Sequence, residues 1–137
     1  HPIHPERPAM YLQLAKTLGE LEKLDESALA YEEAFKAGVE QSPDTLVSYA
    51  DILSRLNRHE RAIAAYHVAL EKKPNASQAD WARLQIARHW TALKQYERAT
   101  VALAELDIMN DPLLNRLSSS LKTSLRTVDR SERPEGL

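Results

Sequence analysis

The sequence predicts an all-α protein, an α-solenoid of three antiparallel helix pairs followed by one capping helix. The 137 residues include only 3 glycines, and the 7 prolines fall at a few places between long stretches without a helix breaker. Within those stretches apolar residues recur with a period near 3.6, and no segment alternates long enough to suggest a sheet. A pattern of small and large residues that recurs along the chain groups the helices in pairs.

Seven helices are expected, and their ends follow from capping residues and breakers. They span about residues 8–21, 25–37, 43–56, 59–72, 81–93, 95–109 and 112–129. Gly38 ends the second helix, because glycine adopts a left-handed backbone without penalty. Ser42 caps the third helix and Pro43 suits its first position. The fifth follows the stretch NASQAD, in which Ser77 and Asp80 have the spacing of a capping box.

The stretch RAIAAYHVALEKKP shows the recurring pattern. Ala62, Tyr66 and Ala69 follow one another at intervals of four and three residues. Large residues at equivalent places are Tyr31 and Leu103, which lie 35 positions before and 37 positions after Tyr66. Self-similarity at this period marks a solenoid of helical hairpins, in which each pair buries its apolar face against its neighbours.

Small residues are expected where the two helices of a pair approach closely, because a large side chain there would hold the backbones apart. These are Ala15, Ala50 and Ala87 in the first helices and Ser27, Ala62 and Ala99 in the second helices. Large residues three or four positions along the same face fill the space beside them. One domain, residues 8–130, therefore contains repeats at about 8–41, 42–76 and 77–111. We expect a proline-rich lead at 1–7 and a flexible tail at 131–137.

This pattern resembles the tetratricopeptide repeat family over about residues 8–112. The central copy matches best, at Leu46, Tyr49, Ala50, Leu53, Ala62, Tyr66, Ala69 and Pro74. The third copy departs from the pattern at Arg83, Leu103 and Leu106. The resemblance implies a right-handed superhelix whose concave groove is lined by the first helix of each pair. Family members generally bind peptides or partner proteins in that groove, without catalysis.

The resemblance places the groove on the side of the first helices opposite the small contacts. The residues expected there are Leu12, Lys16, Gly19, Val47, Asp51, Ser54, Trp81, Leu84, Arg88 and Thr91. Leu12, Val47 and Leu84 form an apolar track. Lys16, Asp51 and Arg88 form a charged track of alternating sign. Such a surface suits the binding of an extended segment or an amphipathic helix. Trp81 is the expected anchor, because aromatic residues dominate binding energy at interfaces. The alternative is that Leu12 and Leu84 pack against neighbouring repeats and that Trp81 covers the junction at 75–79.

The seventh helix is not another full repeat. Asn110 or Asp111 caps it and Pro112 is its first residue. Its apolar stripe consists of Leu113, Leu114, Leu117, Leu121, Leu125 and Val128. A stack of hairpins leaves its last apolar face bare, so a half-polar helix is expected to cover it. The alternative is that the last three residues of the stripe form an interface with a second copy or a partner.

We therefore predict an interaction scaffold that binds a protein or peptide partner in its groove, as part of a larger protein or complex. The alternative is a structural module that self-associates, as a homodimer for example, through its last helix or its first hairpin. Chaperone-binding members of the family clamp a terminal carboxylate with several cations and an asparagine. Lys16 is the single cation at the corresponding places here, so that clamp is not expected. Many bacterial members work in envelope assemblies, such as polymer export or cytochrome maturation, and a similar setting is a further expectation.

Other functions are not expected. The net charge of −2 lacks the basic excess of proteins that grip nucleic acid, and no apolar run reaches the roughly 20 residues of a membrane span. With no cysteines the chain has no disulfide or thiolate metal site, and its compartment stays open. His59 and His67 lie about 12 Å apart along one helix, too far to share a metal ion. We expect no catalytic residues, metal or cofactor, and we expect a fragment or processed chain, because the first methionine is Met10.

Overall fold

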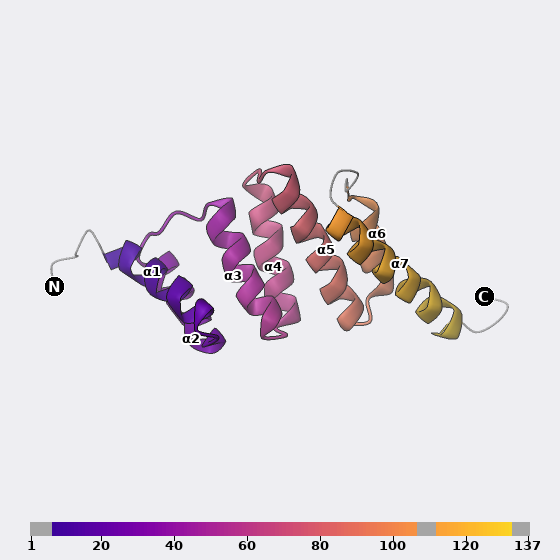
Figure 1. Ribbon diagram of the computed structural model, residues 1–137, viewed down its shortest axis with the longest axis horizontal. Helices are drawn as coiled ribbons and strands as arrows, with labels where there is room; N and C mark the ends of the chain where they lie inside the picture. The colour runs from indigo at the N-terminus through magenta and orange to yellow at the C-terminus, as the bar shows by residue number, and fades with distance from the viewer. Residues whose placement is uncertain (1–6, 107–111, 133–137) are drawn as a thin grey trace.

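The computed structural model describes residues 7–106 and 112–132, with side chains as far as residue 128. Within these residues the chain forms seven helices and no strand (Figure 1). They are α1 (Arg7–Glu20), α2 (Leu24–Lys36), α3 (Pro43–Arg55), α4 (His59–Glu71), α5 (Ala76–Ala92), α6 (Tyr96–Ala104) and α7 (Pro112–Glu132). The predicted all-α solenoid is confirmed.

The helices follow one another as three pairs along the long axis of the molecule (Figure 1). α1 packs on α2, α3 on α4 and α5 on α6, and the pairs join through the contacts α2–α3 and α4–α5. α3 also contacts α5 directly, whereas no comparable contact joins α2 to α4 or α4 to α6 in the described part of the chain. The first helices of the second and third pairs therefore approach more closely than the second helices, so they lie on the inner side of the stack.

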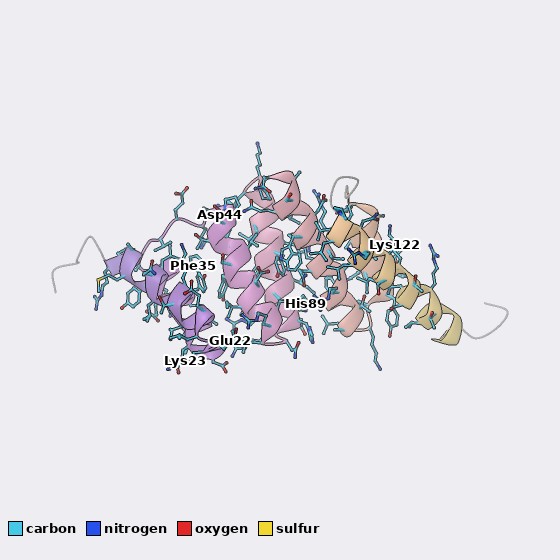
Figure 2. All side chains as sticks on the ribbon, in the orientation of Figure 1. Glu22, Lys23, Phe35, Asp44, His89 and Lys122 are labelled. Carbon is cyan, nitrogen blue, oxygen red and sulfur yellow. The ribbon has the colours of Figure 1, made fainter. Side chains whose placement is uncertain are left out.

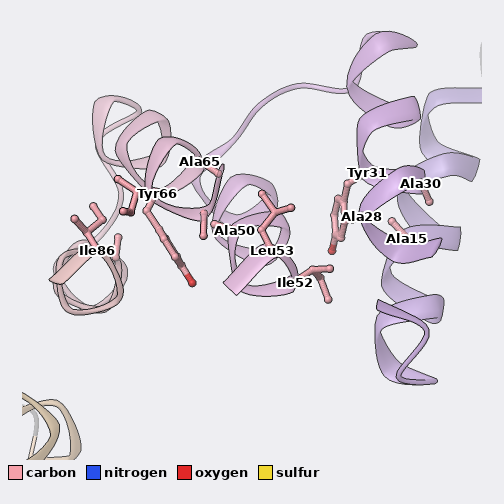
Figure 3. Packing of buried hydrophobic residues seen from close by; sticks show 13 residues of the cluster. Ala15, Ala28, Ala30, Tyr31, Ala50, Ile52, Leu53, Ala65, Tyr66 and Ile86 are labelled. Atoms are coloured by element: carbon pink, nitrogen blue, oxygen red, sulfur yellow. The ribbon is translucent and has the colours of Figure 1, made fainter. Parts of the chain in front are cut away.

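The small residues lie where the repeat pattern predicts them. Their side chains are completely buried, and they are Ala15, Ser27, Ala50, Ala62, Ala87 and Ala99. Tyr31, Tyr66 and Leu103, the large residues beside them, are also buried. Figure 3 shows Tyr31 and Tyr66 within one continuous cluster of buried residues that extends from α1 to α5. Close approach at small residues thus allows large neighbours to fill the core without gaps.

The helix starts confirm one predicted cap and correct another. Ser42 accepts a hydrogen bond from the backbone nitrogen of Thr45, and Pro43 is the first residue of α3. α5 begins earlier than expected, because its cap is Asn75 rather than Ser77. The side chain of Asn75 accepts a hydrogen bond from the backbone nitrogen of Gln78, and the side chain of Gln78 accepts one from the backbone nitrogen of Asn75. The capping box is therefore formed by Asn75 and Gln78 and not by the predicted pair, Ser77 and Asp80.

The helix ends also differ from the predicted boundaries. α6 ends at Ala104, five residues before the predicted end at 109. α7 continues to Glu132, so its last two residues belong to the predicted flexible tail. Arg7, assigned to the proline-rich lead, already belongs to α1. The rest of that lead, the predicted cap at Asn110 or Asp111 and the remainder of the tail lie outside the described residues.

Polar contacts differ between the two junctions of the stack. Three carboxylates of the first pair bind three arginines of the second pair, as Glu22–Arg55, Asp25–Arg58 and Glu32–Arg61. Tyr49 on α3 also packs against the rings of Tyr31 and Phe35, with centroids 5.7 and 5.4 Å away. No ion pair joins the second and third pairs among the residues with described side chains. That junction uses a hydrogen bond from Gln78 to Asp44 and the bonds described next.

Candidate functional site

A carboxylate joins three helices on the inner side of the stack. The indole nitrogen of Trp81, on α5, donates a hydrogen bond of 2.9 Å to Oδ1 of Asp51, on α3. The hydroxyl of Tyr66, on α4, donates to the same oxygen. The hydrogen bond fixes the orientation of the Trp81 ring. Trp81 is only partly buried, so part of this fixed ring remains exposed.

Burial determines the ionisation of this cluster. It raises the pKa of Asp51 above its ordinary value, and the hydrogen bonds from Tyr66 and Trp81 offset part of that rise. Tyr66 is completely buried, and its pKa is raised because burial and the neighbouring Asp51 carboxylate both oppose a phenolate. The phenol therefore stays protonated and continues to donate to Asp51.

A second polar cluster connects the same helices at His89 of α5, which Figure 2 marks near the middle of the stack. Its Nε2 lies 2.7 Å from the hydroxyl oxygen of Ser54, and its Nδ1 lies 2.8 Å from Nδ1 of His59. Burial and then the nearby charges of His59 and Arg88 lower the pKa of His89 to about 4. His89 is therefore neutral near pH 7, and one imidazole donates to the other.

Most of the predicted groove residues retain some exposure. Lys16 and Arg88 are exposed, and the partly buried residues are Leu12, Val47, Asp51, Ser54, Trp81 and Thr91. Leu12, Val47 and Trp81 also pack against the main hydrophobic cluster. They therefore fill two roles at once, because one side of each supports the core and the other remains accessible.

The prediction is wrong for Leu84, which is completely buried. It belongs to a second hydrophobic cluster with Leu103, Leu114 and Leu125. The reason is that α7 packs on α5, so an apolar side chain at the end of the stack contacts the last helix instead of facing the groove. This outcome agrees with the alternative reading of Leu84 as a packing residue.

Gly19 was also expected in the groove, and the structure gives it a different role. A Cβ atom at this position would lie 3.3 Å from Cδ1 of Ile52 and 3.4 Å from Oγ of Ser27. Gly19 therefore marks a close approach of α1 to the neighbouring helices, where the missing side chain matters for packing.

The three charged residues of the predicted track differ in their contacts. Asp51 is committed to Trp81 and Tyr66, so its carboxylate already has protein partners. Lys16 and Arg88 make no ion pair with a carboxylate among the described residues, although Arg88 donates a 2.9 Å hydrogen bond to Gln85. Lys16 and Arg88 are therefore the exposed charges of this track.

The predicted interface on α7 is also altered. Leu125 is buried and belongs to the second hydrophobic cluster, so it packs within the protein rather than on an exposed face of α7. Leu121 and Val128 are partly buried. These positions fit a helix that covers the last apolar face of the stack, since Leu125, the middle one of the three, packs on the protein itself.

Sequence reasoning missed the contact between His59 and His89. It compared His59 with His67, which lies on the same helix, whereas the actual partner lies 30 residues away on the next hairpin. The repeat could have indicated this contact, because residues about one period apart meet across a junction.

No group of three or more histidine, cysteine, aspartate or glutamate side chains in the described residues could hold a metal ion. None of the helices in this part of the chain has the length and apolar character needed to cross a membrane.

Stacked helical hairpins with an inner face built from their first helices define the class of α-solenoid interaction scaffolds. A sequence model of the tetratricopeptide repeat family matches residues 8–37 and 43–75, which correspond to the first two helix pairs. The chain is a tetratricopeptide repeat protein. No curated protein is significantly similar to it. Repeats of this family generally mediate protein–protein interaction and act as non-catalytic scaffolds.

Proposed function

We propose that this chain binds a segment of a partner protein along the face formed by α1, α3 and α5. The observation that carries the proposal is the fixed orientation of Trp81. Its indole is bonded to Asp51, and its ring is partly exposed on the inner side of the stack. A rigid aromatic ring loses little conformational freedom on binding, which makes it a suitable anchor.

The neighbouring charges indicate the chemistry of the partner segment. Lys16 and Arg88 are exposed on the same helices as the groove residues and have no carboxylate partner among the described side chains. Leu12 and Val47 supply apolar surface between and beside them. A segment that carries apolar and acidic residues in alternation complements this surface, and no catalytic step is part of the proposal.

The test captures partners from an extract of the source organism with matched baits. The baits are the native chain, Trp81→Ala, the charge reversal Lys16→Glu/Arg88→Glu, and Arg116→Glu as a control on α7. Circular dichroism first establishes that all four are folded. The proposal requires a protein held by the native and Arg116→Glu baits and lost from the other two. A segment of that protein must then bind the native chain directly, in isothermal titration. Equal capture by all four baits would contradict the proposal.

A second candidate function, self-association through the first hairpin, is favoured by exposed apolar residues on α1 and in the turn that follows it. Met10, Leu14 and Leu21 are 64%, 48% and 61% exposed. In the repeat, Leu14 is equivalent to Tyr49 of α3, which packs against the preceding hairpin. The exposed residues thus form a stacking surface without a described neighbour. Sedimentation of the native chain and of Leu14→Glu distinguishes the two functions, because only self-association predicts an oligomer that Leu14→Glu dissociates.

A further inference from the structure

A cleft separates α6 from α7 at the C-terminal end of the stack. Its volume is about 680 Å³. The residues that line it are Tyr96, Glu97, Thr100, Leu103 and Ala104 of α6 and Lys122, Leu125 and Arg126 of α7. α7 runs obliquely to the pairs before it, and its C-terminal half extends beyond the end of the stack (Figure 1).

The repeat explains why the cleft is open. Thr100 on α6 is equivalent to Ile63 on α4, since both precede the large residue of their helix by three positions. Ile63 is buried beneath the helix that follows it, whereas Thr100 is exposed. α7 therefore covers α6 less completely than α5 covers α4, and a flank that is normally closed by stacking remains accessible.

The cleft has an apolar end and a charged side. Leu103 and Leu125 are buried members of the second hydrophobic cluster, so the cleft reaches the core. Lys122 and Arg126 are exposed and lie one turn apart on α7, where Figure 2 labels Lys122. Neither cation forms an ion pair with a carboxylate whose side chain is described. Glu97 lines the opposite wall, so the lining carries two positive charges and one negative charge.

We propose that this cleft binds a small amphiphilic anion, an apolar chain that ends in a carboxylate. Cavities of roughly 300–1,000 Å³ hold small molecules, and an apolar lining with a few charged groups is typical of such sites. The lining combines two buried leucines with two exposed cations, so a single apolar chain with one anionic end matches it in both apolar and charged character. The apolar chain contacts Leu103 and Leu125, and the carboxylate lies beside Lys122 and Arg126.

The test is isothermal titration of the full chain with dodecanoate below its micellar concentration, with dodecyltrimethylammonium as the cationic counterpart. Three variants accompany the native chain, and circular dichroism checks their folding. Lys122→Gln/Arg126→Gln removes both cations, Glu97→Gln removes the opposing carboxylate, and Arg116→Gln is a matched control outside the cleft. The expected result is saturable 1:1 binding of dodecanoate, weakened roughly tenfold in the double variant, strengthened a few-fold in Glu97→Gln and unchanged in Arg116→Gln.

Equal binding of the cationic detergent would overturn the proposal, because it would leave apolar contact as the sole cause. Dodecanoate affinity that is the same in the native chain and the double variant would also overturn it. A third contrary result is binding of an acidic peptide but not of dodecanoate, which would make the cleft a protein-docking site. Lys16→Glu, on the exposed surface of α1, must leave dodecanoate affinity unchanged, so this result is independent of the groove.

Discussion

The indole nitrogen of Trp81 donates a 2.9 Å hydrogen bond to the carboxylate of Asp51, a residue 30 positions earlier on another hairpin. Tyr66 donates to the same oxygen, so the first and second helices of the central pair both contact the third pair through one carboxylate. Trp81, the proposed anchor for a partner segment, therefore also connects the second and third helix pairs. Substitutions at Trp81 are therefore expected to change stability as well as binding.

Trp81→Phe keeps most of the aromatic surface and removes the hydrogen bond. We expect a loss of about 1–2 kcal/mol in the free energy of unfolding, because the partly buried carboxylate of Asp51 loses a donor. Trp90→Phe is the matched control, since Trp90 is also partly buried and its described contact is a cation–π contact with Arg98. Urea denaturation measures both. Equal losses in the two variants would show that the hydrogen bond contributes nothing specific.

The stability of the fold is expected to fall in mild acid because of His89. Its pKa is about 4 in the folded chain, below the ordinary value of 6.5. As the pH falls through 6.5 toward 4, the unfolded chain takes up a proton that the folded chain does not. Stability is therefore full above pH 6.5 and declines by roughly 3 kcal/mol toward pH 4. Asp51 acts in the opposite sense, because its pKa is raised in the fold.

Urea denaturation as a function of pH isolates the contribution of His89. His89→Gln removes this titration, and we expect a flatter dependence between pH 6.5 and 4 than in the native chain. His67→Gln is the control, because His67 is exposed on α4. Parallel pH profiles for the native chain and His89→Gln would refute the assignment.

Two neighbouring positions at the start of α5 are expected to differ in their effect. Asn75→Ala removes a capping hydrogen bond of 2.8 Å to the backbone of Gln78, and should cost about 1 kcal/mol. Ser77→Ala should change stability by less than about 0.5 kcal/mol, because Ser77 is exposed within the first turn. Thermal denaturation distinguishes them, and a larger loss in Ser77→Ala would restore the cap predicted from the sequence.

The close approach of α3 and α4 is tested by enlarging a small residue. Ala62→Leu should destabilise the fold by roughly 1–3 kcal/mol or more, because Ala62 is completely buried between packed helices. Ala64→Leu makes the same change on the exposed side of α4 and should be nearly neutral. If urea denaturation gave equal midpoints for the two variants, close packing at Ala62 would be disproved.

The fold followed from the sequence because its repeat is local. Ala62 and Tyr66 recur at a fixed period, and each copy forms the same hairpin with the same short-range contacts. The groove was harder to predict, since the pattern places Leu84 on a helix face but does not say which other helix reaches that face. α7 covers it, and the position of α7 depends on long-range packing. The bond from Trp81 to Asp51 and the contacts of His89 were likewise not predicted, because each joins two different hairpins.

The two junctions of the stack are made of different polar chemistry, so different conditions weaken them. Glu22–Arg55 and Asp25–Arg58 are solvent-exposed ion pairs, which dissolved salt screens. The contacts of His89 contain no ion pair and are instead disturbed by protons. High salt is therefore expected to weaken the N-terminal junction more than the C-terminal one, and mild acid the reverse. The central pair takes part in both junctions, so a change of solvent weakens the two ends of the molecule unequally.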